Sequence, residues 1–254
     1  MPSPPKTRGN KPTIKERYPL GEFPPEVITS IGRQITHQLA TGRPDITGDD
    51  FGSIFADAIG GQHAQKPEGV ADVVWNGCAW SVKTVKLPHT SNLHKQQNVR
   101  LISGRNSPKF SSDISDPLLD PEQTGESILK IWNKRRLQAL KDSDSLRVVV
   151  LLRQVEHLKY LLFEEELNSF TPGNYKWTIN ARENLEGREI AANNRHTFTW
   201  QPHGSQFTII RPIPSSAVLF CIKRPPTISR AQVLKEIGYD DTWVTNLGSR
   251  KNNP

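Results

Sequence analysis

Three polar side chains in one short stretch of the sequence could act together on a phosphate ester. Asp72 carries a carboxylate, and Ser81 and Lys83 follow it on the next predicted strand. A carboxylate oxygen is a ligand that Mg²⁺ prefers, and an ammonium can hold a phosphate or stabilise negative charge as it develops. The carbonyl oxygen of Val82 is a further candidate metal ligand. These residues can act jointly only if the chain between them turns back on itself.

The stretch 69–86, GVADVVWNGCAWSVKTVK, predicts such a turn. Its two strand-like runs flank Asn76 and Gly77, a dipeptide that favours a two-residue type I′ turn because both positions tolerate positive φ. That turn places Asp72 opposite Ser81 on one face of the hairpin. The other face is wholly apolar and should be buried; it carries Ala71, Val73, Trp75, Cys78, Trp80 and Val82. Burial of that face leaves the polar side chains together on the opposite one.

This stretch resembles the PD-(D/E)xK nuclease motif of type II restriction endonucleases, because Asp72 is followed by a hairpin and then by Ser81-Val82-Lys83. The match departs at two positions, because Ala71 stands where the family often has proline and Ser81 stands where it has a second acid. The order of the surrounding elements extends the resemblance loosely over about residues 45–225. The resemblance implies an α/β fold with a mixed, restriction-endonuclease-like central sheet flanked by helices, and an additional β-rich C-terminal part.

The resemblance also implies a role for each residue of the motif. Asp72 and the carbonyl of Val82 would ligate Mg²⁺, the expected cofactor. Lys83 would position the attacking water or help to deprotonate it, and Ser81 would bind water or an outer-shell ligand. Many members of this family are homodimers that cut palindromic duplex sites, so a homodimer acting on double-stranded DNA is expected.

An acid from the preceding helix would replace the carboxylate that is missing at Ser81. The segment 47–59 predicts a helix whose first turn is acidic, where the helix dipole favours negative charge. Asp50 is the preferred metal ligand there, with ordinary helix-terminus chemistry as its alternative. Asp57 and Glu68 stay open as further candidates.

A basic stretch follows the motif and is the strongest charge asymmetry of the chain. No acidic residue occurs from Ser81 to Ser112. Cations there can neutralise phosphates, and amide or guanidinium groups can bind base edges bidentately; a solvated loop is the alternative. The candidate DNA-binding residues are Lys86, His89, Lys95, Gln96, Arg100, Arg105, Asn106 and Lys109.

The composition fits a nuclease. The chain has 254 residues and a formal net charge of +7, which favours a polyanionic partner. Its two cysteines, Cys78 and Cys221, are too few for a disulfide framework, which indicates a cytoplasmic protein. No apolar run reaches the roughly 18 residues of a membrane span, and no GxxxxGK[ST] segment predicts a nucleotide cofactor.

The expected organisation has three parts. Residues 1–25 are a basic extended arm, 26–225 a nuclease domain and 226–254 a C-terminal helix with a polar tail. Further elements are predicted from apolar patterning: helices over 25–40 and 126–142, a strand covered on both faces over 146–154, and a strand over 159–167 that runs into a helix.

The resemblance therefore implies a sequence-specific, Mg²⁺-dependent endonuclease for double-stranded DNA, of the type II restriction class. A repair or junction nuclease with the same motif is one alternative, and it would prefer DNA structure over sequence. A non-catalytic DNA-binding protein and an RNA-directed enzyme are the others. The aromatic content of 7% does not favour a base-stacking platform for single strands.

Overall fold

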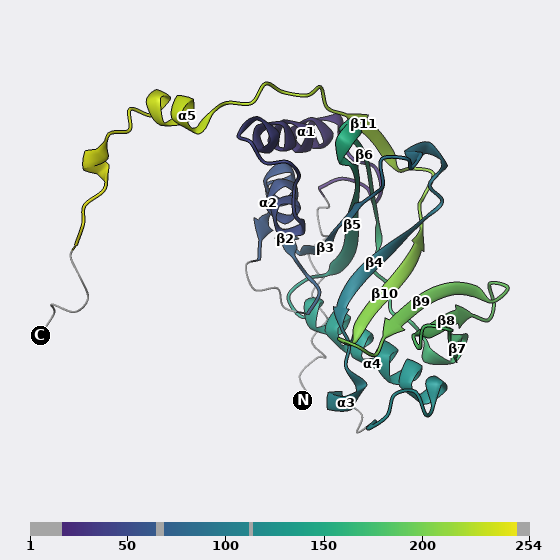
Figure 1. Cartoon of the computed structure of the whole chain (residues 1–254). Helices are drawn as coiled ribbons and strands as arrows, with labels where there is room; N and C mark the ends of the chain where they lie inside the picture. The colour runs from purple at the N-terminus through teal and green to yellow at the C-terminus, as the bar shows by residue number, and fades with distance from the viewer. Residues whose placement is uncertain (1–16, 65–68, 112–113, 248–254) are drawn as a thin grey trace, which may run out of the picture.

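The structure is a computed structural model that describes residues 17–64, 69–111 and 114–247. These residues form three layers (Figure 1), in which helices α1 and α2 pack on one face of a central sheet. Helix α4 and a second sheet pack on its other face. The predicted mixed α/β class is confirmed. Within these ranges, no helix is both long and apolar enough to cross a membrane.

The helices begin where the sequence offers caps. Pro25 occupies the first turn of α1, where an absent N–H costs no hydrogen bond, and the side chain of Thr47 caps α2. Helix α4 begins five residues before the predicted start at 126, because Asp120 caps it and Pro121 fits its first turn. The helices are α1 (Pro25–Ala40), α2 (Gly48–Ile59), α3 (Pro108–Ser111), α4 (Pro121–Ala139) and α5 (Arg230–Glu236).

The central sheet has the strand order β1-β2-β3-β5-β6-β11. Strands β3 and β5 pair in parallel and the other neighbours are antiparallel, so the predicted mixed sheet is confirmed. Strand β5 is buried from Leu146 to its end, as its continuous apolar run predicts. The strands are β1 (Gln62–His63), β2 (Val73–Trp75), β3 (Cys78–Lys86), β5 (Ser145–Gln154), β6 (Lys159–Glu166) and β11 (Val218–Cys221).

Strand β6 does not run into a helix, and that prediction is wrong. The Glu164 side chain points into the core, where its carboxylate accepts from Arg147 Nη1 and Trp80 Nε1, each at 2.9 Å. The phenol of Tyr18 lies against the same carboxylate at 3.3 Å. A buried carboxylate is stable only when it is paired and hydrogen-bonded, so this network holds Glu164 in a strand.

The β-rich C-terminal part forms a separate sheet with the order β4-β10-β9-β8-β7. Its edge strand β4 comes from the basic stretch that follows the motif. One face of this sheet packs with α4 against the central sheet through side chains such as Trp132, Phe198 and Phe207. The strands are β4 (Asn98–Arg105), β7 (Tyr175–Ile179), β8 (Leu185–Glu189), β9 (Arg195–Gln201) and β10 (Gln206–Pro212).

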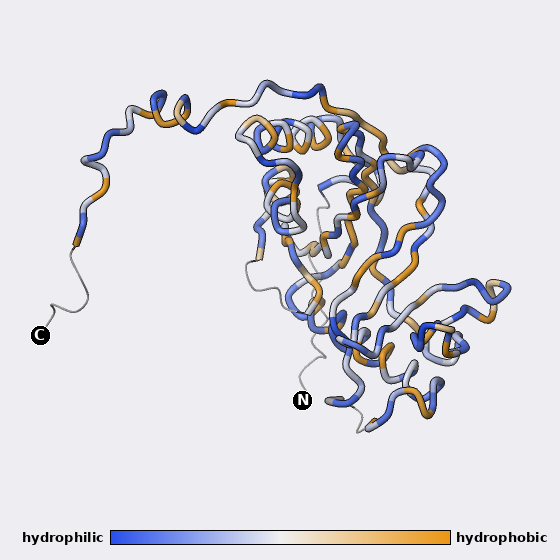
Figure 2. The backbone as a smooth tube through the Cα atoms, in the orientation of Figure 1, coloured by the Kyte–Doolittle hydropathy of each residue, from blue (hydrophilic) through white to orange (hydrophobic). Residues whose placement is uncertain are grey.

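The two ends of the described chain differ. Residues 1–16 of the predicted basic arm lie outside the described residues, but Tyr18 and Phe23 are buried in the core beside α1, so the arm does not extend to residue 25. After β11 the chain runs away from the body and carries α5 on its own (Figure 1). Hydrophobic positions recur along that segment (Figure 2).

Candidate active site

The hairpin between β2 and β3 has the predicted turn, and the predicted register holds from Val73 to Trp75. The predicted pairing of Asp72 with Ser81 does not form, because the Asp72 N–H donates to Trp80 instead. Asn76 and Gly77 have φ values of 42° and 79°, as a type I′ turn requires. Trp75 pairs with Cys78, and Val73 pairs with Trp80. The indole of Trp80 is buried against α2, where it packs edge-on against Phe55 with centroids 5.7 Å apart. This packing fixes which face of β3 is left for polar side chains.

Regular strand pairing ends at Asp72, the residue directly before β2. The Asp72 N–H donates to the carbonyl of Trp80 at 2.8 Å, although Trp80 is already the register partner of Val73. Regular alternation therefore ends there, and Ala71 packs with Ala79 on the α4 side. The predicted placement of Ala71 on the face of Val73 is wrong for this reason. Irregularities of this kind commonly re-aim a side chain at a functional site.

The carboxylate of Asp72 gathers the other residues of the motif. Its Oδ2 accepts from the backbone N–H of Val82 at 2.7 Å. The same oxygen lies 3.4 Å from Ser81 Oγ and 3.4 Å from Lys83 Nζ. Its Oδ1 makes no hydrogen bond to any described residue. Asp72, Ser81, Val82 and Lys83 are thus brought together as the sequence predicts, with one carboxylate oxygen available.

Two cavities meet at this carboxylate, and Asp72 and Lys83 line both of them. One has a volume of about 150 Å³ and lies beside α2, with Val82 in its wall. The other has a volume of about 110 Å³ and lies beside α4, with Ser81 in its wall. Each side chain is about a quarter exposed, at 26%, so a substrate can reach both groups.

Asp49, and not Asp50, lines the cavity beside α2. The Asp50 carboxylate is held away by a capping box with Thr47 and an ion pair of 2.5 Å with Arg43. Burial alone would raise the pKa of Asp50, but its bonds to Thr47 and Arg43 together lower it. Asp57 is exposed and lines neither cavity. Glu68 lies outside the described residues.

His63 was not predicted from the sequence, yet it lines the same cavity. Its Nδ1 is 3.1 Å from Ser53 Oγ, and its Nε2 is 3.7 Å from the Asp49 carboxylate. Gly52 permits this approach, because a Cβ at that position would lie 2.4 Å from His63 Nε2. The residue sits on the two-residue strand β1, and a strand that short gives no periodic signal in the sequence.

Arg135 on α4 is a second residue that the sequence did not single out at this site. Its guanidinium donates to the carbonyl of Ser103 at 2.8 Å and to Asn106 Oδ1 at 3.0 Å. Burial lowers the pKa of Arg135 and the charge of Asp72 raises it, and the group stays protonated at neutral pH. Gly104, with φ of 90°, leaves room for it, since a Cβ there would lie 2.8 Å from Arg135 Nη1.

Most of the predicted DNA-binding residues are on the surface. The exposed ones are Lys86, His89, Lys95, Arg100, Arg105 and Lys109. Gln96 is half-buried, and its amide donates to the carbonyl of Asn98 at 2.7 Å.

The prediction for Asn106 is wrong, because the residue is fully buried. Its side chain bonds to the Ile128 carbonyl and to Arg135, and its own carbonyl accepts from Trp200 Nε1. It supports the core and cannot read a base.

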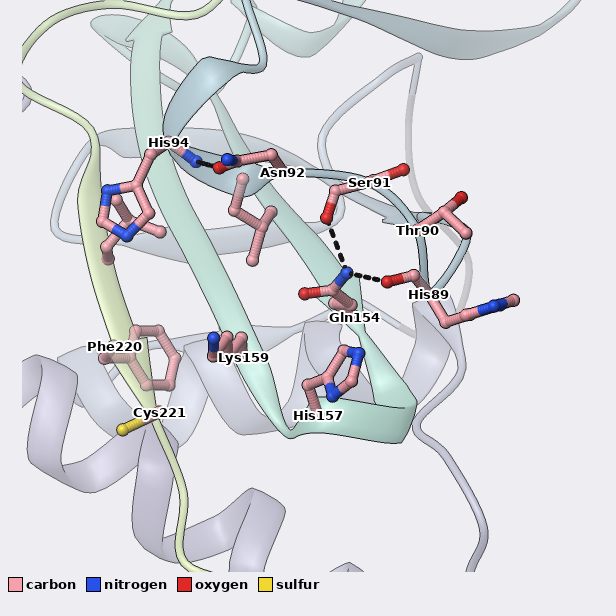
Figure 3. Close-up of a pocket in the computed structure, with 12 residues that line it drawn as sticks. His89, Thr90, Ser91, Asn92, His94, Gln154, His157, Lys159, Phe220 and Cys221 are labelled. Carbon is pink, nitrogen blue, oxygen red and sulfur yellow. Dashed lines mark hydrogen bonds between the residues drawn. The ribbon is translucent and has the colours of Figure 1, made fainter.

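A cavity of about 610 Å³ lies at the C-terminal end of β5 (Figure 3), and no residue of the motif lines it. His89, His94 and His157 line it, and the Gln154 amide donates to the carbonyls of His89 and Ser91 at 2.7 Å each. In the described ranges, no group of three or more His, Cys, Asp or Glu side chains could hold a metal ion. These histidines are therefore not a candidate zinc site.

The cavity beside α2 has a donor set that fits Mg²⁺. It is lined by Asp72 and Asp49, whose carboxylates are hard oxygen donors, and by Val82, whose carbonyl is the further candidate ligand. Mg²⁺ keeps several waters in proteins and is usually bound through one or two carboxylates. Comparison with protein-family models, with curated proteins and with solved structures found no match for the chain.

Proposed function

We propose that this protein is a Mg²⁺-dependent endonuclease that hydrolyses phosphodiester bonds of double-stranded DNA, with the sequence specificity of a type II restriction enzyme. One observation carries the proposal: the Asp72 carboxylate, with Lys83 Nζ 3.4 Å from one of its oxygens, lies where two solvent-reachable cavities meet. A carboxylate and an amine held together at an open site are what metal-assisted hydrolysis requires.

The protein groups have separate roles. Asp72, Asp49 and the Val82 carbonyl would hold Mg²⁺, which would activate a water and neutralise charge on the phosphate. Lys83 binds the scissile phosphate or takes part in deprotonating the water. Arg135 adds a second positive charge on the α4 side of the carboxylate. Ser81 is buried and reaches Asp72 at 3.4 Å, so it orients the carboxylate.

The protein would act as a homodimer, so that a two-fold assembly matches a two-fold DNA site. The C-terminal segment supports this proposal, because Trp243 and Leu247 on it are 59% and 94% exposed. Exposed apolar side chains mark an association surface when several of them occur close together, and Ile237 and Val244 on the same segment are exposed as well. Light scattering should give a dimer mass for the native chain and a monomer for Trp243→Ser with Leu247→Ser. A native monomer would contradict the proposal.

Incubation of the native chain with long duplex DNA tests the nuclease proposal. Discrete fragments with Mg²⁺ and none with EDTA are expected. Cleavage at junctions or flaps with no discrete fragments from linear duplex would instead favour a repair nuclease. Mg²⁺-independent binding without any cleavage would leave a DNA-binding protein.

A further inference from the structure

The second sheet has one face that packs in the core and one that no helix covers (Figure 1). Burial alternates along β4, so Leu101 faces the core while Arg100 faces outward. On β9, Trp200 belongs to the core cluster, and the next residue, Gln201, is half-buried and lines the other side of the sheet. Together with the turn between β7 and β8, this outer face bounds a cavity of about 480 Å³. The position of this face makes it available to a macromolecule.

A backbone irregularity adds His196 to the outer face. Gly187 pairs with Phe198 but Arg188 pairs with His196, so β9 has one extra residue there. Such a bulge reverses the alternation of side chains, and His196 joins Thr199 on the outer side. Its Nε2 lies 3.1 Å from Thr199 Oγ1, which also accepts from Arg100 Nη2 at 2.9 Å. The threonine thereby orients the guanidinium before any ligand binds.

The lining of the cavity has the chemistry of base recognition. Guanidinium, amide and imidazole groups line it, with Ala181 as the one apolar residue among those that bound it. The side chains of Gln201 and Asn184 make no hydrogen bond to any described residue, so both amides are available. Pockets for small organic ligands are mostly apolar, whereas arginine reads guanine and glutamine or asparagine reads adenine bidentately.

The charge of the face also suits DNA. Its one acid, Glu186, is engaged by Asn180 at 2.9 Å and by Arg188 at 2.8 Å. The hydrogen bond from Asn180 is the main reason that the pKa of Glu186 lies below its usual value. Burial acts in the opposite direction, and Arg188 lowers the pKa further. Arg100 and Arg182 therefore leave the cavity with net positive charge.

One strand links this face to the candidate active site. Strand β4 carries Arg100 on the outer face and Ser103 on the wall of the cavity beside α4. Three residues of an extended strand span about 10 Å. The two side chains lie on opposite faces of this edge strand, so a duplex on the outer face would reach the candidate active site by passing around the β4 edge of the sheet.

We propose that the outer face of the second sheet reads base edges of duplex DNA, through Arg100, His196, Gln201 and Asn184. This inference rests on the proposed function and identifies the part of the protein that gives it sequence specificity. Strands are known readers of DNA grooves, and the major groove has room for a two-stranded ribbon.

The test separates recognition from cleavage. Full-length protein carrying Asp72→Ala is used in EDTA to select bound duplexes from a random library, and affinities are then measured for the selected and for a random duplex. We expect one enriched sequence. Arg100→Ala or Gln201→Ala in that background should lower the ratio of the two affinities by about 5- to 150-fold, the range for loss of one bidentate base contact.

Two further variants keep the result interpretable. Lys130→Ala removes an exposed cation of α4 that is paired with Glu126, and it should leave the affinity ratio unchanged. Gln201→Glu should change which base is enriched, an effect that a purely structural role would not produce, because glutamate accepts from cytosine where glutamine pairs with adenine.

The possible failures are distinguishable. If the native chain does not cut DNA but the affinity ratio falls as expected, the recognition face stands and the nuclease proposal fails. If the native chain cuts discrete sites and folded Arg100→Ala and Gln201→Ala keep the same sites and ratio, the recognition face is overturned and the nuclease proposal survives. That second result would point to a protein partner for the face.

Discussion

The backbone N–H of Val82 donates to Oδ2 of Asp72 over 2.7 Å, across the end of the β2–β3 hairpin. This bond fixes one oxygen of the carboxylate and leaves Oδ1 unbonded to described residues. The geometry therefore leaves Oδ1 of Asp72 available to bind a cation.

Substitution of Lys83 should impair catalysis more than DNA binding. Lys83→Ala should lower the rate of cleavage by about 10²- to 10³-fold, because a charge that stabilises the transition state is lost. Single-turnover cleavage and binding in EDTA measure the two effects separately. Lys141→Ala, at an exposed lysine outside both cavities, is the control for a loss of charge. Equal losses of rate in the two variants would contradict a role for Lys83 in the reaction.

Asp49 and Asp50 are adjacent in sequence and should behave differently. Asp49→Asn should raise the Mg²⁺ concentration needed for half-maximal cleavage by about 10- to 100-fold, a typical cost of disturbing a metal site. Asp50→Asn should leave that concentration unchanged, because Asp50 is bonded to Thr47 and Arg43. A Mg²⁺ titration of the two variants decides between them. The reverse order would restore Asp50 as the metal ligand.

Asp50 should instead affect stability in a pH-dependent way. Its pKa in the folded protein is lowered, so its contribution is fully present above the unfolded-state value of about 3.9 and is lost as the pH falls through the folded-state value. The difference in unfolding free energy between native protein and Asp50→Asn should therefore be constant from about pH 7 to 5 and shrink at lower pH. Urea unfolding across this range measures it. A difference that grows toward acid would contradict the assignment.

The buried pair of Glu164 and Arg147 should stabilise the fold only as a unit. Glu164→Ala leaves the guanidinium without its buried carboxylate, and it should lower the free energy of unfolding by about 3–5 kcal/mol. Joint replacement by Glu164→Leu and Arg147→Met should recover part of that loss, because no unpaired charge remains. Denaturant unfolding checks both. A double variant less stable than Glu164→Ala would contradict this view.

Local patterns in the sequence predict the hairpin and its site well. The Asn76-Gly77 turn specifies the register of Val73–Trp75, and the irregularity at Asp72 then directs its carboxylate to Val82 and Lys83. The sequence also contains the information that favours Asp49 over Asp50 as the metal ligand. Thr47 followed by Asp50 at the third helical position is a capping-box pattern, which occupies Asp50 and leaves Asp49 available.

Tertiary contacts explain what the sequence could not predict. His63 and Arg135 reach the site from a short strand and a distant helix, and no spacing connects either to Asp72. Asn106 follows an exposed arginine in a polar stretch, yet the approach of α4 and Trp200 buries it. Glu164 looks like the start of a helix because its partners, Arg147 and Trp80, lie on other strands.

The most direct measurement is cleavage of long duplex DNA by native protein and by Asp72→Asn, with Mg²⁺ or EDTA. Asparagine can still accept the Val82 N–H but carries no charge, so the hairpin should stay folded, as circular dichroism would verify. We predict discrete fragments from the native protein with Mg²⁺ alone and none from Asp72→Asn, with duplex binding in EDTA preserved in both. Equal cleavage by folded Asp72→Asn, or no cleavage by a native protein that binds DNA, would contradict the proposed nuclease.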